Sequence, residues 1–97
     1  MKKKVYISVP ISGKDITEVN LHVDLAKKGL ESNDYNPITP FDASPDSNES
    51  YAEHMGKDIQ ALLECDAVFF CRGWQESKGC QAEYEVAKIY GKQMVFE

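Results

Sequence analysis

A carboxylate on the apolar face of a helix is the first feature of the sequence that could do chemistry. Residues 72–90 join an apolar strand to a helix whose N-cap is Ser77, and Glu83 falls six residues later among the core-facing positions. A capping-box glutamate would stand three residues after the N-cap, so Glu83 lies about one turn too deep for that role. Two interpretations remain open. Glu83 either borders the sheet and reaches water, or is partly desolvated beside helix-terminal amides, as suits a nucleophile attacking an electrophilic sugar carbon.

Two other side chains could assist such a carboxylate. Tyr6 lies on the first expected strand, where a tyrosine is more typical of the core, and Asp58 lies on the flank of a helix, where a solvated charge is the usual finding. Gly79 would let a ligand approach the backbone closely. His22 and His54 each stand alone on a helix and are expected at the surface.

Length and charge restrict the class of protein. The 97 residues are expected to form one small domain, 1–97, and oligomerisation would be an easy way to complete a site. A net charge of −5 argues against duplex nucleic acid or an anionic membrane as partner. A single nucleotide is still compatible, because a helix N-terminus binds phosphate without net positive charge. No stretch approaches the roughly 18 apolar residues that span a bilayer.

The three cysteines indicate a reducing compartment. Cys65, Cys71 and Cys80 are odd in number, embedded in apolar sequence and without a histidine at zinc-site spacing, so neither a disulfide framework nor a zinc site is expected. They are interpreted as reduced core residues of a cytoplasmic protein. Residues 1–4 resemble the start of a signal peptide, but the apolar run that follows soon meets Pro10, which favours a first strand instead.

Strands and helices alternate along the chain. Strands are expected at residues 4–9, 35–38, 67–71 and 93–96, and helices at residues 15–32, from 50 to about 64, and from 77 to 90. Residues 39–50 contain two prolines and are expected to form a long loop. The last helix is expected to bury one arc of side chains, namely Gly79, Ala82, Val86, Ala87, Ile89 and Tyr90.

The order β-α-β-α-β-α-β predicts a three-layer, doubly wound α/β fold of the flavodoxin-like or Rossmann-like kind. Its sheet of about four strands would be parallel, with right-handed crossovers and helices on both faces. In such sheets ligands bind beyond the carboxyl ends of the strands, at the switch point. The turn at residues 10–13 and the loops at 39–50 and 72–79 are expected to meet there.

Several sequence features converge on that edge of the sheet: Tyr6 with the Pro-Ile-Ser-Gly turn at residues 10–13, Asp58 on its helix, and Ser-Lys-Gly at residues 77–79 followed by Glu83. Together they resemble the nucleoside 2-deoxyribosyltransferase family, including its branch of deoxynucleoside 5′-monophosphate N-glycosidases. The resemblance covers nearly the whole chain. It is closest to small phage and bacterial members that, like this chain, carry a Gly-Trp pair before the Ser-x-Gly element.

The resemblance implies covalent catalysis. Glu83 matches the family glutamate that attacks C1′ of the deoxyribose and forms a glycosyl ester, which is then passed to a new base or to water. Tyr6 matches the strand tyrosine that orients this nucleophile, and Asp58 matches the aspartate that assists the leaving base. The residues predicted to bind substrate are Ser8, Pro10, Ile11, Gly13, Trp74, Ser77 and Gly79. No metal or organic cofactor is implied, and a homodimer or larger homo-oligomer is expected.

Ser77 bears on the class of substrate. Transferases of free nucleosides carry an aspartate at that position, whereas a hydroxyl beside helix amides tolerates a 5′-phosphate, as in the monophosphate-hydrolysing branch. Two differences oppose phosphate binding: Ser12 replaces the basic residue of that branch's first loop, and Val9 stands where a glycine is usual. Two roles are open for Trp74, which could stack on a base or sugar or cover the core.

A second class of function stays open. The family's established enzymes continue past the fourth strand into residues that complete a neighbouring subunit's site, whereas this sequence ends at Glu97. The alternative to a deoxyribosyltransferase or N-glycosidase is therefore a non-catalytic nucleotide- or nucleotide-sugar-binding module in the same fold. A small-molecule nucleoside or nucleotide is the expected partner in both cases.

Overall fold

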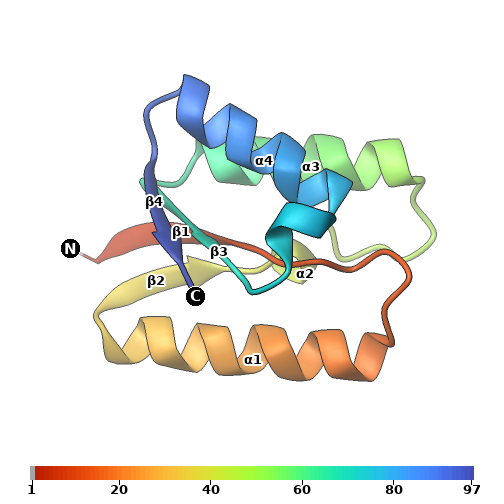
Figure 1. Cartoon of the computed structure of the whole chain (residues 1–97), viewed down its shortest axis with the longest axis horizontal. Coiled ribbons are helices and arrows are strands. Elements are labelled where there is room, and N and C mark those ends of the chain that lie inside the picture. Colours follow the sequence, from red (N-terminus) through yellow and green to blue (C-terminus); the bar gives the residue numbers. More distant parts are fainter. Residues whose placement is uncertain (1) are drawn as a thin grey trace.

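The computed structural model describes residues 2–97, which form a four-stranded parallel sheet covered by helices on both faces (Figure 1). The strands are β1 (Lys3–Ser8), β2 (Tyr35–Ile38), β3 (Ala67–Phe70) and β4 (Gln93–Phe96), and their order in the sheet is β2-β1-β3-β4. Helix α1 (Ile16–Ser32) packs on one face, and α3 (Tyr51–Leu63) and α4 (Lys78–Ile89) pack on the other. The predicted three-layer α/β fold is confirmed. Met1, which belongs to the segment expected to begin the first strand, lies outside the described residues.

Strand β1 separates the two cores and thereby positions the site. Successive side chains of a strand point to opposite faces of the sheet. Val5 and Ile7 are fully buried in the core on the α1 side, whereas Tyr6 packs in the core on the α3 and α4 side. Ser8 points to that second side as well, because its hydroxyl reaches α4. β1 pairs with β2 along one edge and with β3 along the other, so these side chains stand on an interior strand.

The sheet order places the carboxyl ends of β1 and β3 next to each other. The chain runs outward from β1 to β2 and then returns past β1 to β3. The helices that follow β1 and β3 lie on opposite faces, which is the arrangement of a switch point. The turn after β1 and the segment after β3 are therefore brought together at one edge of the sheet, as the sequence predicts.

A short helix, α2 (Pro40–Ala43), lies in the segment that is expected to be a long loop, so that expectation is wrong at these four residues. Thr39 and Asp42 form a capping box, in which each side-chain oxygen accepts a hydrogen bond of 3.0 Å from the other residue's backbone N–H. Pro40 occupies the first turn, where its fixed φ favours a helix. These reciprocal bonds stabilise a single turn that the proline-rich composition does not reveal.

The buried face of α4 differs in part from the expected arc. Cys80, Glu83 and Ala87 are buried, at spacings of three and four residues. Three members of the expected arc are exposed, namely Ala82, Ile89 at 74% and Tyr90 at 63%. Ile89 lies two residues after Ala87, about 200° round the helix, and Tyr90 is already the C-cap. The expectation that Glu83 faces the core is confirmed.

Other expectations about the core agree with the structure. The buried stripe of α1 is Val19, Val23, Ala26 and Leu30, as its spacing predicts. The three cysteines are buried and free of disulfides. No helix within residues 2–97 combines the length and the apolar character that crossing a membrane would take.

Candidate active site

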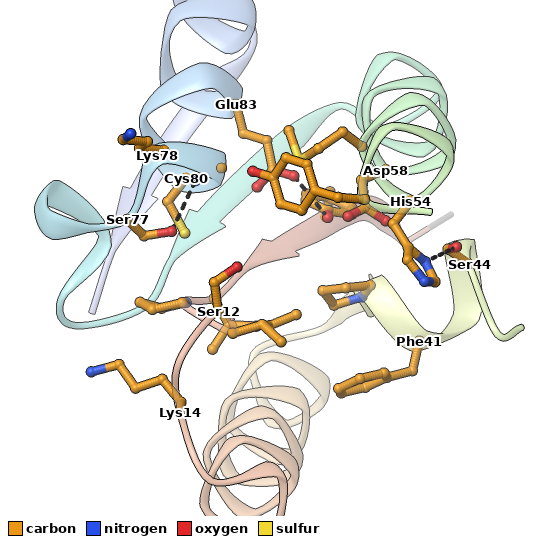
Figure 2. A pocket seen from close by; sticks show the side chains of 18 of the residues that line it. Ser12, Lys14, Phe41, Ser44, His54, Asp58, Ser77, Lys78, Cys80 and Glu83 are labelled. Carbon is orange, nitrogen blue, oxygen red and sulfur yellow. Dashed lines mark hydrogen bonds between the residues drawn. The ribbon is translucent and has the colours of Figure 1, made fainter. Parts of the chain in front are cut away.

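A cavity of about 660 Å³ opens at the carboxyl ends of β1 and β3 (Figure 2). Its walls come from the turn after β1, from α2 and the loop that follows it, from α3, and from the start of α4. This volume is typical of small-molecule sites, which span about 300–1,000 Å³. The cavity lies at the switch point, where parallel sheets of this kind bind their ligands.

Glu83 lies in the wall of this cavity with only 4% of its surface exposed. Its two carboxylate oxygens accept hydrogen bonds from different hydroxyls of β1. Tyr6 donates to Oε2 at 3.1 Å, and Ser8 donates to Oε1 at 2.6 Å. The sequence leaves open whether Glu83 reaches water or is desolvated, and in the structure its carboxylate is desolvated and held by two hydroxyls.

Asp58 provides a second carboxyl group in the same wall. It projects from α3, is 9% exposed, and is therefore not the solvated charge that a helix-flank aspartate usually is. Its Oδ1 is buried and has no hydrogen-bond partner among residues 2–97. A buried carboxylate oxygen without a partner in the protein is rare, and an atom of this kind that borders a cavity is free to accept a hydrogen bond from a bound water or ligand.

Burial shifts the acid–base behaviour of both carboxyl groups. It raises the pKa of Glu83 to about 7, an effect that the Ser8 and Tyr6 hydroxyls oppose and the Asp58 charge reinforces. Burial likewise raises the pKa of Asp58 to about 6, opposed by His54 and Tyr6. Burial and the two carboxylates raise the pKa of Tyr6 well above its usual value, so Tyr6 stays a neutral donor. Both carboxyl groups therefore titrate closer to neutral pH than exposed carboxyl groups do.

One side of the cavity carries hydroxyl and ammonium groups (Figure 2). Ser12 and Lys14 come from the turn after β1, while Ser77 and Lys78 come from the start of α4. Ser77 is the N-cap of α4, as predicted, and its Oγ accepts a hydrogen bond of 3.3 Å from the Cys80 N–H. Neither lysine is among the residues that the sequence predicts to bind substrate. Their sequence positions could have identified them, because Lys14 follows the glycine of the first turn and Lys78 is the middle residue of the Ser-Lys-Gly element.

The opposite side of the cavity combines an aromatic ring with a hydrogen-bonded serine and histidine (Figure 2). Phe41 comes from α2, and Ser44 follows that helix. The Ser44 hydroxyl is hydrogen-bonded to Nδ1 of His54, which lies one turn before Asp58 on α3. The sequence predicts a surface histidine here, whereas His54 is half-buried and lines the cavity. Only the fold brings the two residues together.

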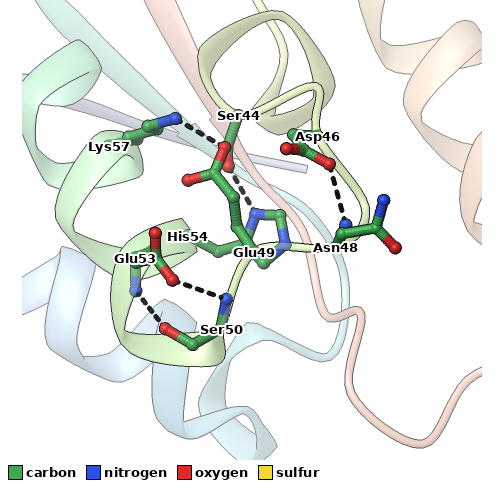
Figure 3. Close-up of polar contacts among 8 residues, drawn as sticks. All are labelled: Ser44, Asp46, Asn48, Glu49, Ser50, Glu53, His54 and Lys57. Carbon is green, nitrogen blue, oxygen red and sulfur yellow. Dashed lines mark hydrogen bonds and ion pairs between the residues drawn. The ribbon is translucent and has the colours of Figure 1, made fainter.

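Polar contacts fix the loop that carries Ser44 (Figure 3). The Asp46 carboxylate accepts a hydrogen bond of 2.9 Å from the Asn48 N–H, which closes a tight turn. Glu49 forms an ion pair with Lys57 of α3. The predicted capping box at the start of α3 is present, because Ser50 and Glu53 each accept a hydrogen bond of 3.1 Å from the other's backbone N–H. This wall of the cavity is thus tied to α3 on both sides of the loop.

The remaining residues predicted to bind substrate fall into two groups. Those in the cavity wall are Pro10, Ile11, Ser77 and Gly79, and Ser8 lies behind them as the partner of Glu83. Gly13 is exposed, with a φ of 76° that suits a glycine turn, and does not line the cavity. Trp74 stacks on Tyr84, with ring centroids 4.8 Å apart, and also lies outside the cavity wall. Trp74 therefore covers the core, which is one of the two roles that the sequence leaves open.

The part of the chain that the structure describes holds one group of side chains that could share a metal ion: His22, Cys71 and Glu97. Cys71 packs in the core on the α1 side, and His22 lies on α1 itself. This group is therefore on the other face of the sheet from Glu83. The cavity itself offers three carboxyl groups, those of Asp58, Glu76 and Glu83, together with hydroxyls and two ammonium groups.

Comparison with models of known protein families gives a match over nearly the whole chain. A family model described as Domain of unknown function (DUF4406) matches residues 3–96. A search of the curated proteins finds no match. The matched range contains all four strands and both of the buried carboxyl groups, Asp58 and Glu83.

Proposed function

The chain belongs to the DUF4406 family, and we propose that it cleaves or transfers at the N-glycosidic bond of a deoxynucleoside or its 5′-monophosphate, through a covalent glycosyl ester on Glu83. One observation carries the proposal. A buried carboxylate held by two hydroxyls lines a cavity of nucleoside size, with a second buried carboxyl group in the same wall. The resemblance to nucleoside 2-deoxyribosyltransferases supports the same reaction.

The reaction would proceed in two displacements. A carboxylate oxygen of Glu83 attacks C1′, the bond between C1′ and the base nitrogen breaks, and the base leaves with the bonding electrons. Asp58 or a water molecule supplies the proton that the departing base takes up. Water or a second base then attacks C1′ of the ester and gives up a proton to Asp58 or to solvent, and Glu83 leaves as carboxylate. The oxocarbenium-like transition states are stabilised by the nearby negative charge, as in retaining glycoside hydrolysis.

The environment of Glu83 suits the role of nucleophile. The hydroxyls of Tyr6 and Ser8 hold the carboxylate in one orientation and favour its ionised form. Burial raises its pKa and so makes the carboxylate a stronger base than an exposed glutamate. Asp58 is the second candidate proton donor, because burial raises its pKa to about 6 and a larger fraction of its carboxyl group is protonated near neutral pH than in an exposed aspartate.

The two sides of the cavity suit the two ends of a nucleotide. Lys14 and Lys78, with the hydroxyls of Ser12 and Ser77, would face the sugar's 5′ end and its phosphate. Phe41, on the opposite side, offers a ring on which a base can stack. Lys14, two residues after Ser12 in the same turn, and Lys78 would supply positive charge to the phosphate, partly offset by the Glu76 carboxylate, which also lines the cavity.

Intact-mass spectrometry tests the reaction directly. After incubation with a panel of deoxynucleosides and their 5′-monophosphates, we expect a mass gain equal to a deoxyribosyl group or its phosphate, mapped to Glu83, together with free base by chromatography. The adduct would identify the substrate branch as well as the nucleophile. Absence of both adduct and free base, at concentrations where a nucleotide raises the melting temperature, would contradict the proposal.

A lysine substitution separates nucleotide from nucleoside substrates. Lys14→Gln is expected to raise KM for a 5′-monophosphate about tenfold, because it removes a positive charge from the proposed phosphate side. KM for the free deoxynucleoside should change less than about twofold, since no phosphate is present. Lys28→Gln, at an exposed α1 lysine outside the cavity, is the matched control. Equal changes for both substrates would place the phosphate elsewhere.

The second function worth testing is a non-catalytic nucleotide- or nucleotide-sugar-binding module. The feature that favours it is the first loop, where Ser12 and Val9 stand in place of residues usual in the enzymes that the chain resembles. The mass measurement above distinguishes the two functions. A homo-oligomer is part of the proposal in either case, and it would cover Leu21 and Leu25, which are 60% and 61% exposed one turn apart on α1.

A further inference from the structure

Three side chains with metal-ligating atoms meet at the carboxyl end of the sheet, on the face opposite the cavity. They come from three separate elements: His22 from α1, Cys71 from the end of β3, and Glu97 from the residue after β4. One nitrogen, one sulfur and one carboxylate oxygen all lie within 4.8 Å of one another. We propose that this group binds a Zn²⁺ ion, with water as the fourth ligand.

The set of donor atoms fits zinc. Imidazole, thiolate and carboxylate are the three protein ligands that zinc takes, and three of them plus a water make the usual open site. Zinc bond lengths of about 2.0–2.3 Å place tetrahedral ligand atoms about 3.3–3.6 Å apart. The distance of 2.8 Å between His22 Nε2 and a Glu97 carboxylate oxygen would have to open by about 0.5 Å to reach that geometry. Both side chains are partly exposed, at 30% and 28%, so this adjustment meets little resistance.

The surroundings also favour a bound ion. The Arg72 N–H donates to the Glu97 carboxylate at 2.6 Å, which orients it toward His22. Cys71 is fully buried against apolar side chains, so a metal–sulfur bond there would be shielded from water. The exposed edges of His22 and Glu97 leave a path by which an ion can enter.

Charge and proton balance can be written for the binding step. Zn²⁺ replaces the proton of the Cys71 thiol, which is released to solvent, while His22 binds as neutral imidazole and Glu97 as carboxylate. The hydrogen bond between His22 and Glu97 is exchanged for two bonds to the metal. Thiolate and carboxylate together carry two negative charges, so the loaded site is neutral and no electron is transferred.

Cobalt and zinc titrations of the full chain, purified in the presence of chelator and reductant, test the site. Co²⁺ should bind with a stoichiometry of one, give a thiolate-to-cobalt charge-transfer band, and be displaced by Zn²⁺, which should raise the melting temperature. Cys71→Ser should lose the band, whereas Cys65→Ser, at another buried cysteine, should keep it.

A second variant keeps the test decisive should the serine in the core impair folding. Glu97→Gln is nearly isosteric and still accepts the Arg72 N–H, but it should weaken Zn²⁺ binding at least about tenfold. His22→Gln should weaken it by a similar factor. Absence of a thiolate band in the wild-type chain, or equal Zn²⁺ affinity in the wild-type and Glu97→Gln proteins, would overturn the proposal.

Discussion

Replacing Glu83 with glutamine is expected to lower base release by at least about 10³-fold and to abolish the covalent adduct. A neutral amide cannot form the glycosyl ester, so the first displacement has no nucleophile. The amide oxygen can still accept a hydrogen bond from the Tyr6 or Ser8 hydroxyl, so the shape of the cavity should persist. The dissociation constant of a bound nucleotide should therefore change by less than about threefold.

The matched control for this substitution is Glu85→Gln, at an exposed glutamate two residues along the same helix. This control should release base and form adduct at the wild-type rate, since residue 85 lies outside the cavity wall. Base release and adduct formation should be quantified in the wild-type protein and both variants under the same conditions. Equal activity in the Glu83→Gln variant and the wild-type protein would exclude Glu83 as the nucleophile.

The second large effect of the same substitution is a gain in stability, in contrast to the expected loss of activity. At pH 8, Glu83→Gln is expected to raise the free energy of unfolding by about 1–3 kcal/mol. The pKa of Glu83 rises from its usual 4.5 to about 7 on folding, so the folded chain binds more protons than the unfolded chain between these values. The corresponding stability is fully present below pH 4.5 and is lost as pH rises through 7. Glutamine does not ionise, so the variant does not lose this stability as the pH rises.

Urea denaturation at pH 5 and pH 8 measures this difference. The stability advantage of the Glu83→Gln variant over wild type should be large at pH 8 and shrink at pH 5, where Glu83 is protonated in the folded state. Glu85→Gln should show no pH-dependent difference, because residue 85 is exposed. A pH-independent difference for the Glu83 variant would mean that its carboxyl group titrates normally in the folded protein.

The two predictions concern one physical property. An ionised carboxylate taken out of water is costly to the fold, and the same desolvation makes it reactive. Stability and activity are therefore expected to change in opposite directions at Glu83. Such opposition is common at functional sites and is not expected of a residue that serves packing alone.

Hydrophobic spacing predicted the sheet, the long helices and the edge where the cavity opens. The failures concern local hydrogen bonds and helix ends that spacing does not report. Helix α2 depends on the capping box between Thr39 and Asp42, inside a segment whose prolines suggest a loop. In α4, the apolar side chains of Ile89 and Tyr90 suggested burial, but the helix ends there and both remain exposed.

The candidate site was predictable where a residue breaks the pattern of its own element. Glu83 stood out because a carboxylate occupies a core-facing position of an amphipathic helix. His54 gave no such signal, since its contact with Ser44 depends on how α2 and α3 pack. The His22, Cys71 and Glu97 group is invisible to motif spacing for the same reason, because its members come from three distant segments.

The cavity is built from two parts that differ in how freely their residues can be substituted. Tyr6 and Ser8 belong to an interior strand that is paired along both edges, so the two hydroxyls that bind the Glu83 carboxylate share the rigidity of the sheet. The opposite wall, residues 40–50, lies outside the sheet and is tied mainly to α3. If the proposed function holds, substitutions in that wall change which base is accepted and leave the Glu83 carboxylate in place. Relatives of this chain would then acquire new substrates while keeping the same chemistry.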